Sequence, residues 1–148
     1  MSPTKELEIS VVIPAYNAAA HLENTLQSIY RQADTRYEIL VIDDGSTDDT
    51  PRILRTHQNR VRTIRLDNSG GPARPRNVGI QNSQAPLIAF FDADDIMLPG
   101  NLAAAVRAFQ TNGSAGIYCT EFGGIDESGN LIVNNWLSSY SDFRRELV

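Results

Sequence analysis

Short apolar strands alternate with helical patterns through the first hundred or so residues, and this alternation limits the possible folds more than any other feature. Residues 8–14, 37–42, 61–66 and 87–91 are rich in Val, Ile and Leu, as strands are. Helical spacing between such strands is typical of a parallel sheet joined by crossover helices. The sequence therefore predicts an α/β fold, with a mostly parallel sheet and helices on both faces, in one domain whose core spans about 8–120.

Two of the intervening segments carry apolar residues at i, i+4 and i+7, a spacing that places them on one face of a helix. Turn-forming sequences at 46–49 and 69–72 are expected to open two further helices, which end near Thr56 and Asn82. Asn17 is expected to cap the first helix. The spacing is shown by Leu22, Leu26 and Ile29 in one segment and by Leu102, Val106 and Phe109 in the other.

Beyond residue 113 the pattern changes. Residues 115–120 predict a further strand, with Cys119 as a small buried side chain at its end. Residues 126–130 predict the turn of a hairpin, and 141–147 a terminal helix. Cys119 is the only cysteine, which excludes an internal disulfide and a metal site built from cysteines.

The charge balance argues against nucleic acid as a partner, because 13 basic residues face 18 acidic ones and no basic block occurs. The N-terminus lacks a signal-peptide pattern, and no apolar stretch approaches membrane-spanning length. We expect a cytoplasmic location and leave open a peripheral contact with the cytoplasmic face of the membrane. An exposed sheet edge in a short α/β domain also makes a homodimer a reasonable expectation.

Three carboxylates, Asp92, Asp94 and Asp95, follow directly on the apolar run 86–91, which predicts a buried strand. Alternate residues of an extended segment point to one side, so Asp92 and Asp94 are expected to converge where the strand ends. Mg²⁺ and similar hard cations are bound through one or two carboxylates together with substrate phosphates. The alternative is that these residues only end the strand and cap the helix after Pro99.

Three other distinctive segments, at 14–17, 43–46 and 70–77, also follow predicted strands, and the ends of parallel strands face one crevice. Tyr16 offers a flat face for a base, Asp43 and Asp44 offer hydrogen-bond acceptors, and Arg74 and Arg76 can clamp phosphate. Each has an ordinary alternative: turn or cap chemistry for the aspartates and a solvated helix face for the arginines.

Taken together, four runs resemble glycosyltransferase family 2, in that family's order and approximate spacing. The resemblance covers about residues 8–110, and 125–129 resembles a turn that these enzymes often carry. The four runs are Ser10–Asn17, Ile39–Asp48, Gly71–Ile80 and Phe90–Asp95.

The resemblance implies the nucleotide-sugar-binding domain of a GT-A, Rossmann-like fold and an inverting sugar transfer from a nucleotide-diphosphate sugar, with UDP the expected nucleotide. It implies Mg²⁺ or Mn²⁺ as cofactor, with Asp94 as direct ligand and Asp92 beside the ion and the ribose. Asp95 has no assigned role. By position in the matching runs, Pro14, Ala15 and Tyr16 would line the nucleoside site. Asp43 and Asp44 would contact the base or the ribose. Arg76 would help to hold the nucleotide, together with Arg74.

An inverting transfer also needs a base to deprotonate the acceptor hydroxyl. In this family the base lies well beyond the Asp-x-Asp segment, and no later carboxylate matches it; Glu121 is the nearest candidate. Two hypotheses follow: the donor-binding half of a sugar transferase, or a catalytically incomplete binding module that needs further residues or another chain. The sugar and the acceptor, whether lipid-linked, polysaccharide or protein, stay open.

Overall fold

The computed structural model describes residues 6–120, 123–126, 128 and 130–133. The chain divides into two compact units, Met1–Gly113 and Ser114–Val148.

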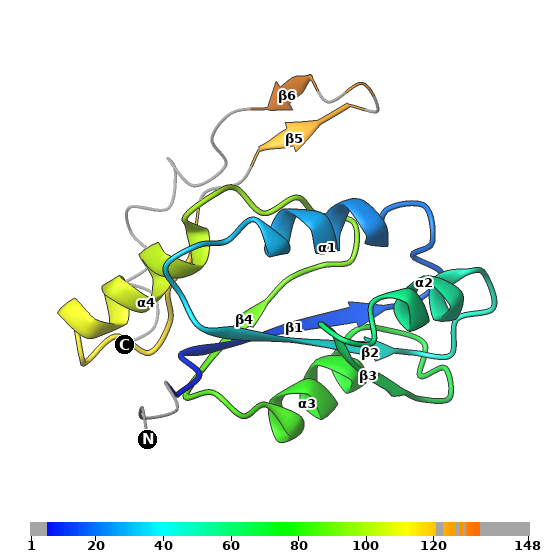
Figure 1. Cartoon of the computed structure of the whole chain (residues 1–148), viewed down its shortest axis with the longest axis horizontal. Coiled ribbons are helices and arrows are strands. Elements are labelled where there is room, and N and C mark those ends of the chain that lie inside the picture. The colour runs from blue at the N-terminus through cyan, green and yellow to red at the C-terminus, as the bar shows by residue number, and fades with distance from the viewer. Residues whose placement is uncertain (1–5, 121–122, 127, 129, 134–148) are drawn as a thin grey trace. The chain divides into compact units, whose positions relative to one another are not determined.

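The first unit is built on a four-stranded parallel sheet, which confirms the predicted α/β class (Figure 1). Its strands are β1 (Ile9–Ala15), β2 (Tyr37–Asp43), β3 (Arg62–Arg65) and β4 (Leu87–Phe90). They lie in the order β3-β2-β1-β4, so the chain moves outward from β1 to β3 and then returns to the other side of β1. The order therefore reverses between β1 and β4, which is where open α/β sheets bind ligands.

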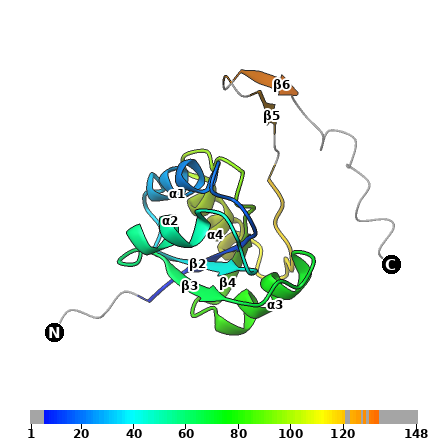
Figure 2. The ribbon, with the colours of Figure 1, turned by 90° about the vertical axis from the view of Figure 1, so that its right-hand side faces the viewer.

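Four helices cover the sheet: α1 (Leu22–Tyr30), α2 (Thr50–Thr56), α3 (Ala73–Asn82) and α4 (Asn101–Thr111). Residues of α1, α2 and α4 share one apolar core with β1 and β2, whereas α3 packs against the other face of these strands (Figures 1 and 2). None of the described helices has the length and apolar character that crossing a membrane requires.

The core explains the spacing seen in the sequence. Successive side chains of β1 and β2 point to opposite faces of the sheet, one covered by α1 and the other by α3. The two largest fully buried side chains on the α3 side of β2 are Leu40 and Ile42. The core on the α1 side includes Ile9, Val11, Ile13, Leu22, Leu26, Ile29, Ile39, Val41, Leu54, Leu102 and Val106.

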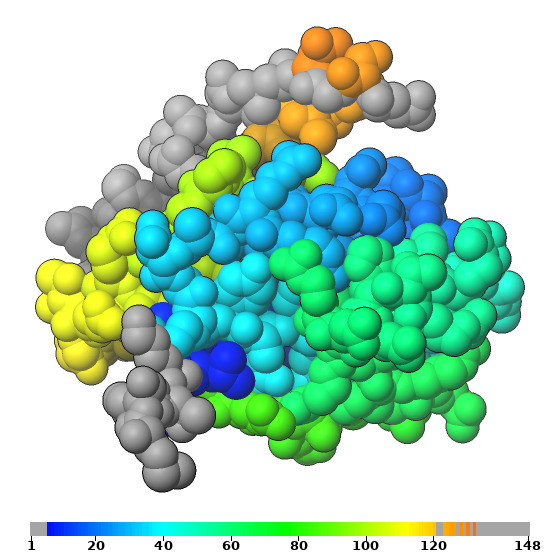
Figure 3. Space-filling model, viewed as in Figure 1, coloured from blue at the N-terminus to red at the C-terminus, as the bar shows by residue number. Residues whose placement is uncertain are grey.

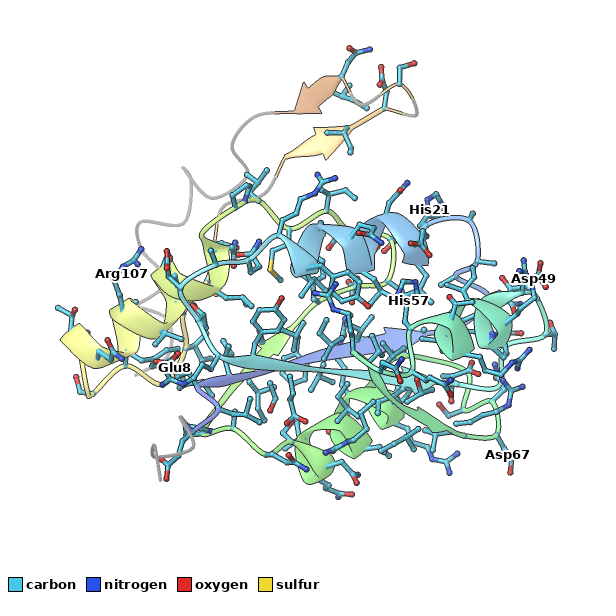
Figure 4. The ribbon with its side chains drawn as sticks, in the orientation of Figure 1. Glu8, His21, Asp49, His57, Asp67 and Arg107 are labelled. Carbon is cyan, nitrogen blue, oxygen red and sulfur yellow. The ribbon has the colours of Figure 1, made fainter. Side chains whose placement is uncertain are left out.

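A polar contact joins α2 to α1. His57, at the end of α2, lies 2.9 Å from the carboxylate of Glu23 and 3.0 Å from the hydroxyl of Tyr30. Arg60 stacks on the ring of Tyr30, 3.5 Å from its centre. Figure 3 shows the surfaces of the two helices meeting on this side, and Figure 4 shows His57 beneath α1.

The strand after residue 86 is not buried as predicted. β4 lies at the edge of the described sheet, and Ile88 and Phe90 are 36% and 50% exposed. Its other side chains, Leu87 and Ala89, pack against the core. α3 packs against β1 and β2, and one face of β4 stays exposed at the edge of the described sheet.

One helix start differs from the prediction, because the cap position of α1 is His21 rather than Asn17. The start of α2 is confirmed, since this helix follows the turn at 46–49 and has Asp49 at its cap position. Neither helix has a side-chain cap at that position. The side chains of Asn17 and Ser46 instead bond across the loops that follow β1 and β2, because those loops are adjacent in space.

In the second unit, the predicted hairpin is confirmed as β5 (Gly124–Ile125) and β6 (Leu131–Val133), joined through hydrogen bonds of Asp126. The strand predicted at 115–120 does not form, and Cys119 is exposed rather than buried. A strand needs a partner for its backbone groups, and no described strand pairs with this segment. The helix predicted at 141–147 lies outside the described residues.

Candidate functional site

A cavity of about 500 Å³ opens at the carboxyl ends of β1, β2 and β4. Figure 4 marks the two ends of the sheet: Glu8 precedes β1 at one end, and Asp49 and Asp67 follow β2 and β3 at the other. As expected from the sequence, the cavity lies at the carboxyl ends of the strands, and the structure places it at the point where the strand order reverses. It is lined by Pro14, Ala15, Tyr16, Asn17, Ala18, His21, Asp44, Asn68, Gly70, Gly71, Pro72, Arg76, Asp92, Ala93 and Asp94.

The loop that carries Tyr16 is clasped to the loop after β2. Asn17 adopts a left-handed conformation, with φ of 49°, and its Oδ1 accepts a hydrogen bond of 2.8 Å from the backbone N–H of Thr47. In return, the backbone N–H of Asn17 donates to Ser46 Oγ at 3.0 Å, and that of Ala18 donates to Thr50 Oγ1 at 2.9 Å. The clasp holds the exposed ring of Tyr16 in the cavity wall.

Asp44 forms part of the cavity wall and also anchors the next loop. Its carboxylate is buried and accepts hydrogen bonds from the backbone N–H and the hydroxyl of Ser69, at 3.0 and 2.8 Å. Gly45 makes this approach possible, because a Cβ there would lie 2.7 Å from the backbone N of Asn68. An ionised carboxylate has about four acceptor sites, so Asp44 keeps capacity for a ligand.

The neighbouring Asp43 is placed differently. It is 1% exposed and does not line this cavity. One of its oxygens accepts from the backbone N–H of Ser46 at 2.9 Å, and the other pairs with Arg65, its register partner on β3. The structure therefore gives Asp43 a bracing role between β2 and β3, and it brings only Asp44 to the cavity.

The two arginines of α3 also separate. Arg76 lines the cavity and donates from Nη2 to Asp92 Oδ1 at 2.7 Å, while its buried Nε finds no acceptor among the described residues. Arg74 does not line the cavity and donates to the backbone oxygen of Asp67 at 3.3 Å. Arg76 thus places a cation in the cavity wall, beside the carboxylates that follow β4.

The three carboxylates after β4 lie in a turn, not in an extended segment. The backbone N–H of Asp95 donates to the carbonyl oxygen of Asp92 at 3.3 Å, which closes the turn. Asp92 and Asp94 still line the cavity together, whereas Asp95 does not. Burial raises the pKa of Asp95, and repulsion from Asp94 and Asp92 adds to this rise. None of the three caps the following helix, whose cap position is Gly100.

The donor set fits a divalent ion that is shared with a ligand. Asp92 and Asp94 supply carboxylate oxygens, which hard cations prefer. In the described part of the chain, no three His, Cys, Asp or Glu side chains form a group that could hold a metal. Mg²⁺ and Mn²⁺ would therefore need oxygens from a bound ligand, such as a diphosphate, to complete their coordination.

Three cavity residues, Ala18, His21 and Asn68, were not predicted from the sequence. His21 stands at the N-terminal end of α1 (Figure 4), and Asn68 follows β3. All three lie in loops that follow the carboxyl ends of strands, and only this position could have indicated from the sequence that they line the cavity. None has a residue type or spacing that singles it out.

Comparison with known proteins shows the family. The sequence model described as Glycosyl transferase family 2 matches residues 10–147. The chain belongs to glycosyltransferase family 2. Glu121, the nearest candidate for a catalytic base in the sequence, lies outside the described residues.

A family 2 relative illustrates the extent of the match. An uncharacterised glycosyltransferase of Rickettsia bellii is 30% identical over 139 residues, which are 93% of this chain and 20% of that protein. The chain thus spans about one fifth of the length of this relative.

Two solved structures share the fold. TarS of Staphylococcus aureus (residues 1–349), in complex with UDP-GlcNAc, has a TM-score of 0.68 at 30% identity, covering 72% of this chain and 32% of that one. The mannosyltransferase PcManGT of Pyrobaculum calidifontis, in complex with GDP-Man and Mn²⁺, has a TM-score of 0.64 at 30% identity, covering 72% and 33%. The likeness to these family 2 structures confirms the expected GT-A type of fold.

Proposed function

We propose that this chain binds the nucleotide-sugar donor of a family 2 glycosyltransferase, with a UDP-sugar as donor and Mg²⁺ or Mn²⁺ as cofactor, for an inverting transfer to an acceptor. One observation carries the proposal: a single cavity brings together an exposed aromatic ring, a buried carboxylate, an arginine and a pair of exposed carboxylates. These are the groups that a base, a ribose and a metal-bound diphosphate require.

The nucleoside end of the proposed site is formed by Pro14, Ala15, Tyr16 and Asp44. A pyrimidine ring could stack on Tyr16, because its ring is held by the Asn17 clasp and stays exposed. Asp44 is buried and already accepts from Ser69, so its carboxylate is fixed in orientation. A fixed acceptor suits a base that presents an N–H group, such as the imide of uracil, and this supports the proposed UDP.

The diphosphate end is formed by Arg76, Asp92 and Asp94. Arg76 is the cation nearest to the carboxylate pair, and its ion pair with Asp92 leaves Asp94 as the carboxylate without a hydrogen bond or ion pair among the described residues. Asp94 is therefore the better direct metal ligand. When bound, the metal would act as a Lewis acid that stabilises the negative charge on the leaving diphosphate.

A catalytically incomplete binding module is the second candidate function. The carboxylates found in the cavity wall are Asp44, Asp92 and Asp94. All three are assigned to binding the donor, which leaves none of them to act as the base, and this favours the binding module. Incubation of the purified chain with UDP-GlcNAc and a panel of lipid-linked, polysaccharide and protein acceptors separates the two. Acceptor-dependent release of UDP would support a complete enzyme, and donor binding without release would support the binding module.

Donor choice tests the proposed nucleotide. We expect calorimetric titrations to give a lower Kd for UDP than for CDP, because uracil N3 carries the hydrogen that Asp44 would accept and cytosine N3 does not. Equal or tighter binding of CDP would contradict the assignment to UDP.

Replacing Tyr16 tests the nucleoside end. Tyr16→Ala is expected to weaken UDP binding by roughly 1–3 kcal/mol, the range for stacking a base on an aromatic ring, equally with and without metal. Tyr16→Phe keeps the ring and should bind nearly as the wild type does. The measurement is the Kd of UDP by calorimetry. A Tyr16→Ala variant with wild-type affinity would show that the base does not stack there.

A further inference from the structure

The buried side of α1 carries polar side chains where an apolar stripe would suffice. Thr25, Ser28 and Gln32, the last just beyond the helix, are 0%, 3% and 7% exposed. They lie among Leu26 and Ile29, which belong to the main core. Burying a hydroxyl or an amide costs free energy unless it is hydrogen-bonded, so the partners of these groups show what they do.

All three side chains bond to the backbone of the segment between β4 and α4. Thr25 Oγ1 donates to the carbonyl oxygen of Ala93 at 2.8 Å. Ser28 Oγ accepts from the backbone N–H of Met97 at 2.9 Å, and Gln32 Nε2 donates to the carbonyl oxygen of Leu98 at 2.9 Å. This segment contains no helix or strand, so its buried backbone groups depend on such side-chain partners.

The bond from Thr25 reaches the middle of the carboxylate turn. The carbonyl of Ala93 belongs to the planar peptide unit that leads into Asp94. Holding this oxygen fixes the plane from which Asp94 projects, while Ala93 itself is buried against the core. Thr25 Oγ1 also lies 3.3 Å from the carbonyl of His21, but the shorter contact is the one to Ala93.

We propose that Thr25 is a positioning residue for the metal-binding carboxylates, and that Ser28 and Gln32 hold the rest of the loop in the same way. The proposal rests on the proposed function, because it assigns the Asp92–Asp94 turn to a metal-bound diphosphate. Residues outside the ligand set that orient the ligands change metal affinity by about 10–100-fold. Thr25 acts on Asp94 through the backbone, without contact with the donor.

The deciding experiment measures UDP affinity with Mn²⁺ and with EDTA for four proteins: the wild type, Thr25→Val, Thr25→Ser and Ile29→Val. Thr25→Val keeps the shape of the side chain and removes the hydroxyl, whereas Thr25→Ser keeps the hydroxyl. Ile29→Val changes the same buried side of α1 without touching the turn through a hydrogen bond. It controls for a general loss of core packing.

Thr25→Val is expected to lower the UDP affinity measured with Mn²⁺ by about 10–100-fold and to leave the affinity measured with EDTA unchanged. Thr25→Ser should keep most of the increase in UDP affinity that Mn²⁺ gives over EDTA, and Ile29→Val should keep all of it. Amide hydrogen exchange gives a readout without ligand: the N–H of Asp95, which closes the turn, should exchange faster in Thr25→Val than in Ile29→Val.

Three outcomes would overturn the proposal. Thr25→Val could keep the full metal-dependent gain, or it could lose affinity equally with Mn²⁺ and EDTA, as a merely structural residue would. If Thr25→Val fails to fold, Thr25→Ala and Thr25→Ser replace it, and equal metal-dependent gains in these two would contradict the role of the hydroxyl. A wild type that binds no UDP would instead refute the proposed function itself.

Discussion

Asp94→Ala abolishes the metal-dependent gain in UDP affinity and leaves the fold intact; this is the expected result with the largest effect on ligand binding. Asp94 lines the cavity, is exposed, and has no hydrogen bond or ion pair within the described part of the chain. Its loss therefore removes a metal ligand without removing a structural contact. Because even residues around a ligand set change metal affinity by about 10–100-fold, the loss of a direct ligand should reach or exceed the upper end of that range.

Asp95→Ala is the matched control for this prediction. Asp95 carries the same charge in the same turn but does not line the cavity. Titrations of UDP with Mn²⁺ should therefore separate the two variants, while thermal unfolding should give both a Tm close to that of the wild type. A metal-dependent affinity that survives in Asp94→Ala, or that disappears in Asp95→Ala, would show that the ligand is wrongly assigned.

Gly79→Ala is expected to destabilise the first unit by about 1–3 kcal/mol, the usual cost of overpacking a core. Gly79 lies on α3 where the helix crosses Val12 of β1, and a Cβ there would lie 2.1 Å from one methyl carbon of Val12. Since Val12 is fully buried, it cannot move away freely. The better helix propensity of Ala, about 1 kcal/mol, offsets part of this cost but does not reverse it.

The free energy of unfolding in urea measures this effect. Gly113→Ala is the control, because a Cβ at that glycine would meet no atom within 4 Å. Combining Gly79→Ala with Val12→Ala should recover stability relative to the sum of the two single changes, since the smaller side chain makes room for the new methyl group. A Gly79→Ala chain as stable as the wild type would mean that α3 does not approach β1 as closely as described.

Local patterns were enough to predict the four strands and four helices of the first unit and most of the residues that surround the cavity. The strands follow from runs of β-branched and apolar residues, and α1 and α4 from their i, i+4, i+7 spacing. The position of the cavity follows from a rule of parallel sheets, which brings the residues after each strand together.

Features that depend on distant pairing could not be predicted. Asp43 and Asp44 are adjacent and chemically identical, and only the register that pairs Asp43 with Arg65 on β3 directs one of them away from the cavity. The exposure of Phe90 likewise depends on the position of β4 at the edge of the described sheet. The Asn17 clasp joins two loops about 30 residues apart, which no local pattern indicates.

Calorimetric titration of the chain with UDP, once with Mn²⁺ and once with EDTA, tests the central claim most directly. The cavity formed by Tyr16, Asp44, Arg76, Asp92 and Asp94 predicts binding at one site per chain, with a lower Kd when Mn²⁺ is present. Absence of UDP binding in both conditions would contradict the account.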